Sequence, residues 1–335
     1  MASKSSPLQL ISCQTQQNPW ISVICICYNH QNYVLQALKS VVDQAYLATE
    51  LIVIDNGSTD RTAERIDEFS QQYPSIQLIK NATNLGLNRA FNQGLALAHG
   101  QFIIDLSADD VLVPGRLAKQ VAAFQQLPET YGVVFSNAAY IDANGRKTGF
   151  HYPVDVAGHA LTTIPTGFIF REILASYFIC TPTMMIRREV LDKLGGYDET
   201  LSYEDFDFWV RSSRLYQYAY LDEVLTLKRQ LPNALSTRVV LPNNDLLPST
   251  LIVCQKAFAL CITPVEFQVL ASRLKTFIRK AFYAEQFDLA EQFGHLLRQI
   301  SRPDVGTNLI LLISHLHLPV NKVYRWYLKF RSKPV

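Results

Sequence analysis

Two adjacent aspartates, Asp109 and Asp110, follow an apolar segment at residues 102–104. A second apolar segment, residues 51–54, ends in the same way at Asp55. A carboxylate at the end of a buried strand costs desolvation energy unless a cation or a hydrogen-bond donor compensates it, and open α/β sheets bind ligands at that edge. The pattern therefore predicts a site for a metal ion and a polar ligand such as a nucleotide. The alternative is two ordinary acidic loops, since exposed carboxylates are common.

A further acidic pair, Glu204 and Asp205, directly precedes the largely apolar residues 206–210. A carboxylate whose pKa is raised by burial and by a like-charged neighbour is suited to act as a general base. We therefore expect base chemistry at this pair. The alternative is that both acids only begin a helix, because acids stabilise helix N-termini.

The elements that must position these acids alternate along the chain. Apolar periodicity predicts strand, helix, strand, helix, strand, helix and strand, in that order, at residues 20–27, 34–42, 51–54, about 59–69, 76–79, through 90–98 after a turn at 84–86, and 102–104. This alternation predicts βαβ units and a mostly parallel sheet covered by helices.

Five sequence blocks in a fixed order carry a resemblance to a known family. They read SVICICYN at 22–29, IDNGSTD at 54–60, NLGLNRAFNQG at 84–94, LSADD at 106–110, and GGYDE at 195–199 leading to YEDFDFWVR at 203–211. The chain resembles the family-2 inverting glycosyltransferases with the GT-A fold, over about residues 20–240. The resemblance implies transfer of a sugar from a nucleoside diphosphate sugar, with UDP, GDP and dTDP sugars as the donor candidates.

The resemblance also implies a set of donor-binding residues. Asp55 would accept a hydrogen bond from the nucleoside base, Tyr28 would shape the same pocket and Arg89 would flank it. For Tyr28 the alternative is a ring packed at a strand end, and for Arg89 a helix-surface cation. The full expected donor set is Tyr28, Asn29, Asp55, Asn84, Arg89, Asp109, Asp110 and Arg229.

The metal expected from the resemblance is Mn²⁺ or Mg²⁺, since a hard cation held by carboxylates and substrate phosphates stabilises a departing diphosphate. Asp109 matches the second acid of the family's D-x-D motif, and Asp110 follows as a supporting or sugar-contacting acid; both are expected metal ligands. Ser107 stands in place of the first acid. Asp105 points to the same side of the strand if the period is two, where it would either compensate or be a hydrogen-bonded structural residue.

The resemblance places the general base at Asp205, with Glu204 contacting the acceptor or orienting the site. Residues 180–183 lie where the family's acceptor pocket tends to be. Arg229 matches an arginine that closes over the diphosphate from a loop, where a cation neutralises leaving-group charge. The histidine that often follows this arginine in the family is absent here.

Composition limits the partners. The chain has 335 residues, 48% of them hydrophobic, and a formal charge of +2, which excludes a disordered chain and a strongly basic nucleic-acid binder. Its six cysteines show no metal-binding spacing, and no signal peptide is visible. We therefore expect a cytoplasmic enzyme, in contact with the cytoplasmic face of the membrane if its acceptor is lipid-linked.

Three regions are expected: a polar tail at 1–19, a GT-A domain at 20–240 and a helical region at 241–335. In the last helix Val323, Trp326, Tyr327 and Phe330 share one face beside Lys322, Arg325 and Lys329. Such a basic, aromatic, amphipathic helix can lie on an anionic membrane. The alternative is a helix docked on its own domain or on a second copy of the chain. The apolar run at 309–318 is too short to span a bilayer.

The leading hypothesis is an inverting, metal-dependent glycosyltransferase that acts on a glycan or a lipid-linked acceptor in surface polysaccharide biosynthesis. A catalytically weakened sugar-nucleotide binder is the alternative that Ser107 and the missing histidine favour. A sugar nucleotidyltransferase should open with a glycine-rich triphosphate loop and a lysine near the N-terminus, and neither is present.

Overall fold

The computed structural model describes residues 19–231, 239 and 241–331. Four parallel strands form the first half of its sheet, in the order β3, β2, β1, β4. Every residue of β1 is buried, which agrees with the continuous apolar sequence of a strand covered on both faces. The four strands are β1 (Ile21–Cys27), β2 (Thr49–Asp55), β3 (Gln77–Lys80) and β4 (Phe102–Ser107).

The second half of the sheet is mixed. β8 (Met185–Arg187) lies antiparallel between β4 and β6 (Tyr131–Ile141). β6 pairs in parallel with β9 (Gln217–Arg229), and β9 pairs antiparallel with β5 (Val111–Leu112). The short β7 (Lys147–Phe150) pairs antiparallel with β6. The predicted α/β fold, with a mostly parallel sheet of the GT-A type, is confirmed.

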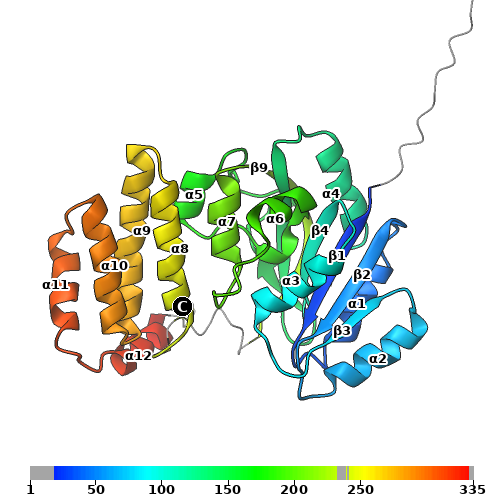
Figure 1. Ribbon diagram of the computed structural model, residues 1–335, viewed down its shortest axis with the longest axis horizontal. Helices are drawn as coiled ribbons and strands as arrows, with labels where there is room; N and C mark the ends of the chain where they lie inside the picture. The colour runs from blue at the N-terminus through cyan, green and yellow to red at the C-terminus, as the bar shows by residue number, and fades with distance from the viewer. Residues whose placement is uncertain (1–18, 232–238, 240, 332–335) are drawn as a thin grey trace, which may run out of the picture.

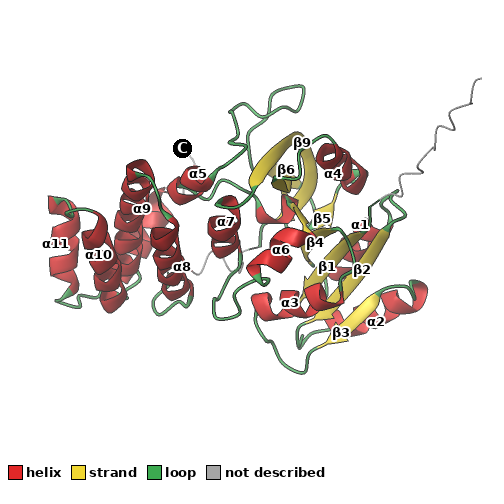
Figure 2. Cartoon of the chain, turned by 45° about the horizontal axis from the view of Figure 1, so that its top comes forward, coloured by secondary structure: helices red, strands yellow, loops and turns green. Residues whose placement is uncertain are grey.

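Helices cover both faces of the sheet (Figure 2), and an apolar core lies on each face. In β1, Val23 and Cys25 face one core while Ile24 and Ile26 face the other, as strand alternation requires. The first core includes α1 (Val34–Val42), α2 (Thr62–Gln72) and α4 (Arg116–Gln125). The second includes α3 (Leu87–Leu97), α5 (Phe170–Ala175), α6 (Arg188–Leu194) and α7 (Asp205–Ser213).

A stack of helices follows the sheet, at the opposite end of the molecule from β3 (Figure 1). It comprises α8 (Leu246–Leu260), α9 (Pro264–Tyr283), α10 (Phe287–Ile300), α11 (Val305–Ser314) and α12 (Asn321–Arg331). Phe206 of α7 contacts Phe277 of α9, which stacks on Phe293 of α10, so the second core runs without a break into the stack.

The predicted C-terminal helical extension is thus present. The domain boundaries at residues 19–20 and 240–241 stay predictions, and residues 1–18, 232–238, 240 and 332–335 lie outside the described part of the chain. Within that part, no helix has both the length and the apolar character needed to cross a bilayer.

Candidate functional site

The turns that follow β1 and β2 are joined by hydrogen bonds. The backbone N–H of Asn29 donates to Ser58 Oγ (3.0 Å), and the N–H of Thr59 donates to Asn29 Oδ1 (2.8 Å). Asp55 is buried at the end of β2 and accepts from the N–H of Ser58 (3.3 Å). The structure therefore brings Tyr28, Asn29 and Asp55 to one edge of the sheet, with the Tyr28 side chain exposed.

Asn56 holds the turn at Asn84 against the same edge. Its Nδ2 donates to Asn84 Oδ1 (3.1 Å) and to the carbonyl of Gly86 (3.2 Å), while its Oδ1 accepts from the N–H of Leu85 (3.1 Å). Gly57 follows at φ +75°, and a Cβ there would lie 2.4 Å from the carbonyl carbon of Thr83. Asn56 was not among the site residues predicted from the sequence. Its place between an acid and a glycine after a strand is the signal for such a turn.

Asp109 and Asp110 face different partners beyond β4. Asp109 Oδ1 accepts from Ser107 Oγ (2.5 Å), and its side chain is partly exposed. Asp110 is buried and accepts from the backbone N–H of Arg229 (2.8 Å). Burial, followed by repulsion from Asp109, raises the pKa of Asp110 to about 8. The contacts of Asp110 thus tie the loop after β4 to β9, and its expected part in metal binding stays a prediction.

Arg229 lies inside the protein, not in an open loop. Its guanidinium is buried, donates to the carbonyl of Asp142 (2.7 Å) and to Gln36 Oε1 (2.7 Å), and lies 4.5 Å from the centre of the Tyr33 ring. A side chain held by these contacts supports β9 from within. Its role as a phosphate clamp stays a prediction that this geometry does not favour, and residues 232–238 of the expected loop lie outside the described chain.

Lys228 is a cation that was not among the site residues predicted from the sequence. It precedes Arg229 on β9 and so projects to the other face of the sheet. Burial alone would lower the pKa of Lys228, but nearby acidic groups outweigh it and raise that pKa; they are Cys180, Asp110, Tyr140 and Asp205. Lys228 is therefore close enough to both Asp110 and Asp205 to interact with their charges. The sequence signal for Lys228 was its place next to Arg229, the arginine that matches the family pattern, because neighbouring residues of a strand project to opposite faces.

Glu204 and Asp205 lie at the start of α7, close enough to Asp105 for the charge of Asp105 to act on Glu204. Asp205 Oδ1 accepts from the N–H of Phe206 (2.6 Å), and Thr181 Oγ1 lies 3.5 Å from Asp205 Oδ2. Burial raises the pKa of Asp205. Burial, then the charges of Asp205 and Asp105, raise the pKa of Glu204 well above its usual range. The pair thus has the electrostatic character expected of a base, and both acids also begin a helix.

Asp105 accepts a hydrogen bond from the Tyr197 hydroxyl at 3.2 Å. Burial raises its pKa to about 7. Tyr197 in turn stacks on Phe91 of α3, with ring centroids 4.1 Å apart. Of the two expectations for Asp105, these contacts agree with the hydrogen-bonded structural one.

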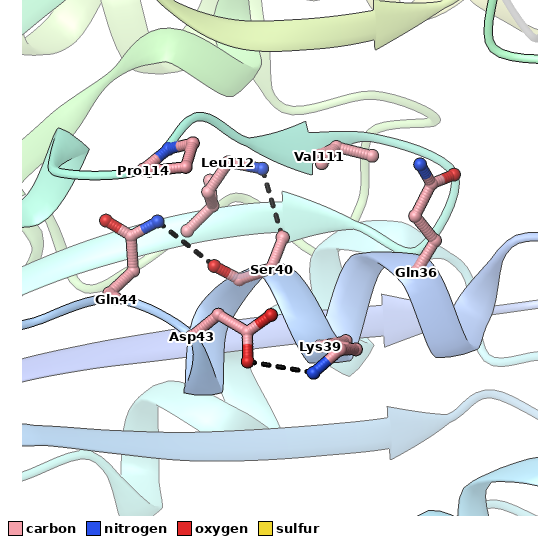
Figure 3. Close-up of a pocket in the computed structure, with 8 residues that line it drawn as sticks. All are labelled: Gln36, Lys39, Ser40, Asp43, Gln44, Val111, Leu112 and Pro114. Atoms are coloured by element: carbon pink, nitrogen blue, oxygen red, sulfur yellow. Dashed lines mark hydrogen bonds and ion pairs between the residues drawn. The ribbon is translucent and has the colours of Figure 1, made fainter.

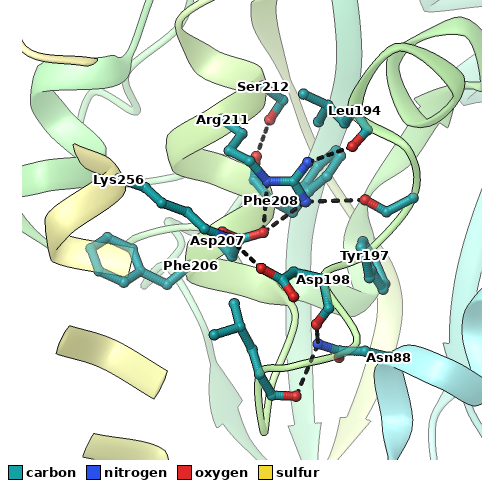
Figure 4. Close-up of polar contacts among 12 residues, drawn as sticks. Asn88, Leu194, Tyr197, Asp198, Phe206, Asp207, Phe208, Arg211, Ser212 and Lys256 are labelled. Carbon is teal, nitrogen blue, oxygen red and sulfur yellow. Dashed lines mark hydrogen bonds and ion pairs between the residues drawn. The ribbon is translucent and has the colours of Figure 1, made fainter. Parts of the chain in front are cut away.

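A charged network fixes α7 and the loop before it (Figure 4). The Lys256 ammonium on α8 lies 2.6 Å from a carboxylate oxygen of Asp198 and 2.6 Å from one of Asp207. Asp207 is 1% exposed and also binds Arg211 at 2.7 Å. Asn88 of α3 donates to the carbonyl of Asp198 (2.6 Å). The loop and the helix that carry Glu204 and Asp205 are therefore anchored from both sides.

Arg89 is a surface residue in the first turn of α3. Its side chain is exposed on α3 and lies 3.9 Å from the Glu199 carboxylate, in keeping with the helix-surface alternative. A shallow hollow between α1 and β5 is also separate from the acids discussed here (Figure 3). In it Leu112 N–H donates to Ser40 Oγ (3.0 Å) and Lys39 pairs with Asp43 (3.0 Å). The hollow contains no expected site residue.

The carboxylate of Asp109 is the group at this edge that is suited to bind a divalent cation. Within the described ranges, no group of three or more acidic, histidine or cysteine side chains is arranged to hold a metal ion. Asp109 offers one partly exposed carboxylate, and Mg²⁺ is commonly bound through one or two carboxylates together with substrate phosphates. The residues fit a cation whose coordination the donor phosphates would complete.

Comparison with known proteins agrees with this architecture. The sequence model of the family described as Glycosyl transferase family 2 matches residues 22–195. An uncharacterized glycosyltransferase of Methanocaldococcus jannaschii is 29% identical over 218 residues, which cover 64% of this chain and 72% of that protein. An uncharacterized glycosyltransferase of Rickettsia typhi is 23% identical over 333 residues, 95% of this chain and 99% of that protein.

Two solved structures share the fold. S. aureus TarS 1–349 in complex with UDP-GlcNAc aligns with a TM-score of 0.58 at 17% identity and covers 92% of both chains. The mannosyltransferase PcManGT from Pyrobaculum calidifontis, in complex with GDP-Man and Mn²⁺, aligns with a TM-score of 0.57 at 17% identity, over 93% of this chain and 84% of that chain.

Proposed function

This chain belongs to glycosyl transferase family 2, and from that premise we propose that it transfers a sugar from a nucleoside diphosphate sugar with inversion at the anomeric carbon. The observation that carries the proposal is the position of Asp205. Its partly buried carboxylate begins α7, and burial raises its pKa. Lys228 is close enough to Asp205 and to Asp110 to interact with both charges.

In the proposed reaction Asp205 removes the proton from an acceptor hydroxyl. The hydroxyl oxygen forms a bond to the anomeric carbon on the face opposite the diphosphate, and the bond from that carbon to the diphosphate oxygen breaks. The electron pair leaves with the diphosphate, and the proton stays on Asp205. A base of this kind typically contributes ~10²–10⁴-fold to the rate.

Two groups of the chain are proposed to meet the leaving diphosphate. Asp109 would hold Mn²⁺ or Mg²⁺, which, when bound, neutralises charge on the phosphates. The Lys228 ammonium, which is close enough to Asp110 and Asp205 to interact with their charges, is proposed to stabilise the negative charge that develops on the diphosphate. Asp55, with Tyr28 and Asn29 beside it, is proposed to receive the nucleoside base.

The acceptor is proposed to be a glycan or a lipid-linked saccharide in surface polysaccharide biosynthesis, reached at the cytoplasmic face of the membrane. The support is the resemblance and the basic, aromatic C-terminal sequence. A second function, a sugar-nucleotide binder with weakened catalysis, is favoured by the hydrogen bond between Ser107 and Asp109, which occupies one oxygen of the expected metal ligand.

A donor panel tests the proposal. UDP, GDP and dTDP sugars are screened by thermal shift with Mn²⁺, since a ligand at a hundredfold excess over its Kd adds about 2.7 kcal/mol of stability. The donor that stabilises the chain is then assayed for nucleotide release with acceptor saccharides, and NMR gives the anomeric configuration of the product. Release with inversion supports the proposal. Tight binding without release supports the binder, and a retained configuration contradicts the inverting mechanism.

A further inference from the structure

The outer face of α11 carries a continuous exposed apolar stripe. Val305, Leu309, Leu312 and Leu316 follow one another at intervals of four, three and four residues, and are 86%, 54%, 65% and 65% exposed. This spacing places Val305, Leu309 and Leu312 on one side of α11, and Leu316 follows them in the turn after the helix. The opposite side, with Thr307, Leu311 and Ser314, is buried. The stripe is therefore not needed to hold α11 on α9 and α10.

The next helix, α12, is docked by one side and exposed on another. The Tyr324 ring stacks on Tyr283 at 4.0 Å, and Asn321 Nδ2 donates to the carbonyl of Tyr283 (2.7 Å). Val323 and Trp326 are nevertheless 69% and 62% exposed. These contacts agree with the expectation of a helix docked on its own domain for one side of α12, while Val323 and Trp326 add two exposed apolar side chains in the helix that follows α11.

Charge along this part of the sequence has a single sign. From Val305 to Val335 there is no aspartate or glutamate, while the whole chain carries a formal charge of only +2. The exposed Lys322 and Arg325 lie beside Val323 and Trp326. The basic residues of the stretch are Lys322, Arg325, Lys329, Arg331 and Lys333. An apolar surface with a basic border matches the interface of an anionic bilayer, where apolar side chains enter the acyl boundary and cations meet headgroups.

We propose that the stripe on α11, together with Lys322, Val323, Arg325 and Trp326 of α12, is the surface by which this chain docks on an anionic lipid bilayer. A second copy of the chain fits this surface poorly, because two such surfaces would bring basic residues against basic residues. The stripe lies at the end of the molecule farthest from β3 (Figure 1), so docking needs no contact with Asp55 or Tyr28. The inference rests on the membrane contact proposed above and on no step of the transfer chemistry.

The test uses the full chain and sedimentation with vesicles of equal parts phosphatidylcholine and phosphatidylglycerol, compared with phosphatidylcholine alone. The variant Leu309→Gln/Leu312→Gln/Leu316→Gln should bind the anionic vesicles at least ~10-fold more weakly, because buried apolar area drives interfacial binding. The matched control replaces three other exposed leucines, Leu47→Gln/Leu97→Gln/Leu215→Gln, and should bind as the unmodified chain does.

Charge is tested separately. Lys322→Glu/Arg325→Glu should weaken binding to the anionic vesicles by ~10-fold or more, since each basic residue near such a surface contributes about 1 kcal/mol. Lys39→Glu/Arg61→Glu changes the net charge equally at exposed residues outside the stripe and should have a smaller effect.

The proposal is overturned if the stripe variant binds vesicles as the unmodified chain does, or if the stripe variant and its control lose vesicle binding equally. It is also overturned if sedimentation without lipid shows that the unmodified chain is a dimer and the stripe variant a monomer. The last result would assign the surface to a second copy. Donor-induced thermal shifts are measured for every variant. A variant that loses vesicle binding but keeps its donor-induced thermal shift still has an intact donor site. The result for this surface can therefore be judged separately from the proposed transfer reaction.

Discussion

Asp109 and Asp110 are neighbours in sequence but have different surroundings in the structure. Asp109 is partly exposed and accepts from Ser107, whereas Asp110 is buried under the backbone of Arg229. The sequence identified both acids, because they follow a buried strand. It could not separate their roles, because the partner of Asp110 is 119 residues away. Strand alternation places Lys228 on the face opposite Arg229, but that this face meets Asp110 and Asp205 depends on distant segments, and Lys228 was not predicted.

Asp109→Ala should abolish the gain in donor affinity that Mn²⁺ provides and leave the fold intact, because a partly exposed carboxylate is removed without opening a cavity. Donor Kd is measured by calorimetry with Mn²⁺ and with a chelator. The control is Asp110→Ala, which leaves the N–H of Arg229 without its acceptor and should lower the free energy of unfolding by about 1–3 kcal/mol. If Mn²⁺ still tightens donor binding in Asp109→Ala, the metal ligand is another residue.

Lys228→Met should lower kcat by about 10²-fold, because removal of one charge-stabilising donor in an active site has an effect of that order. Lys228→Arg keeps the positive charge and should retain more activity. The comparison is made on kcat and on donor Kd, with circular dichroism as a check of the fold. A Lys228→Met enzyme with the kcat of the unmodified chain would show that this lysine does not serve the diphosphate.

At the scale of elements, local periodicity predicted the parallel strands and the helices between them, because each is specified by its own residues. The mixed half of the sheet was not specified in this way. β5 and β8 are only two and three residues long, and their pairing with β9, β4 and β6 depends on distant segments. The anchoring of α7 by Lys256 was also beyond local signals, since Lys256 is 49 residues from Asp207.

Lys256→Met should lower the free energy of unfolding by about 3 kcal/mol, because breaking a buried ion pair leaves an uncompensated charge. Asp207 is 1% exposed and would keep only Arg211 as its cationic partner. The matched control is Lys39→Met, which removes an exposed pair with Asp43 and should cost less than ~1 kcal/mol. Urea unfolding measures both. Equal effects in the two variants would show that the Lys256 contacts do not hold α7.

At the scale of the whole molecule, the sheet and the helical stack share one apolar core. Phe206 and Trp209 of α7 belong to the same cluster as Leu270, Phe277 and Phe293 of the stack. The sequence predicted that the C-terminal region is helical. It did not predict this shared core, because amphipathic periodicity shows that a helix has an apolar face but not which element covers it.

The shared core predicts that the chain unfolds in a single cooperative transition, since separating the stack from α7 would expose the apolar surface of both. Differential scanning calorimetry of the full chain should show one peak, with a calorimetric enthalpy equal to the van't Hoff enthalpy. A chain ending at residue 240 should fail to give a folded, soluble protein. Two resolved transitions, or a stable 1–240 fragment, would mean that the predicted domain boundary separates independent folding units.

Asp205 is proposed as the general base, and this assignment is tested by comparing Asp205→Asn with Glu204→Gln. The measurement is turnover and donor Kd for both variants, together with the pH dependence of kcat/KM of the unmodified enzyme. Because burial raises the pKa of Asp205, and a base must be ionised, kcat/KM should fall as pH falls through a pKa above the usual ~3.9 of aspartate.

Asp205→Asn keeps the size of the side chain and should lose turnover by ~10²–10⁴-fold, with donor Kd nearly unchanged because the lost contact is to the acceptor. Glu204→Gln should lose less. An Asp205→Asn enzyme with near-normal turnover, or a pair of variants in which only Glu204→Gln is inactive, would contradict the account and move the base to Glu204 or to another residue.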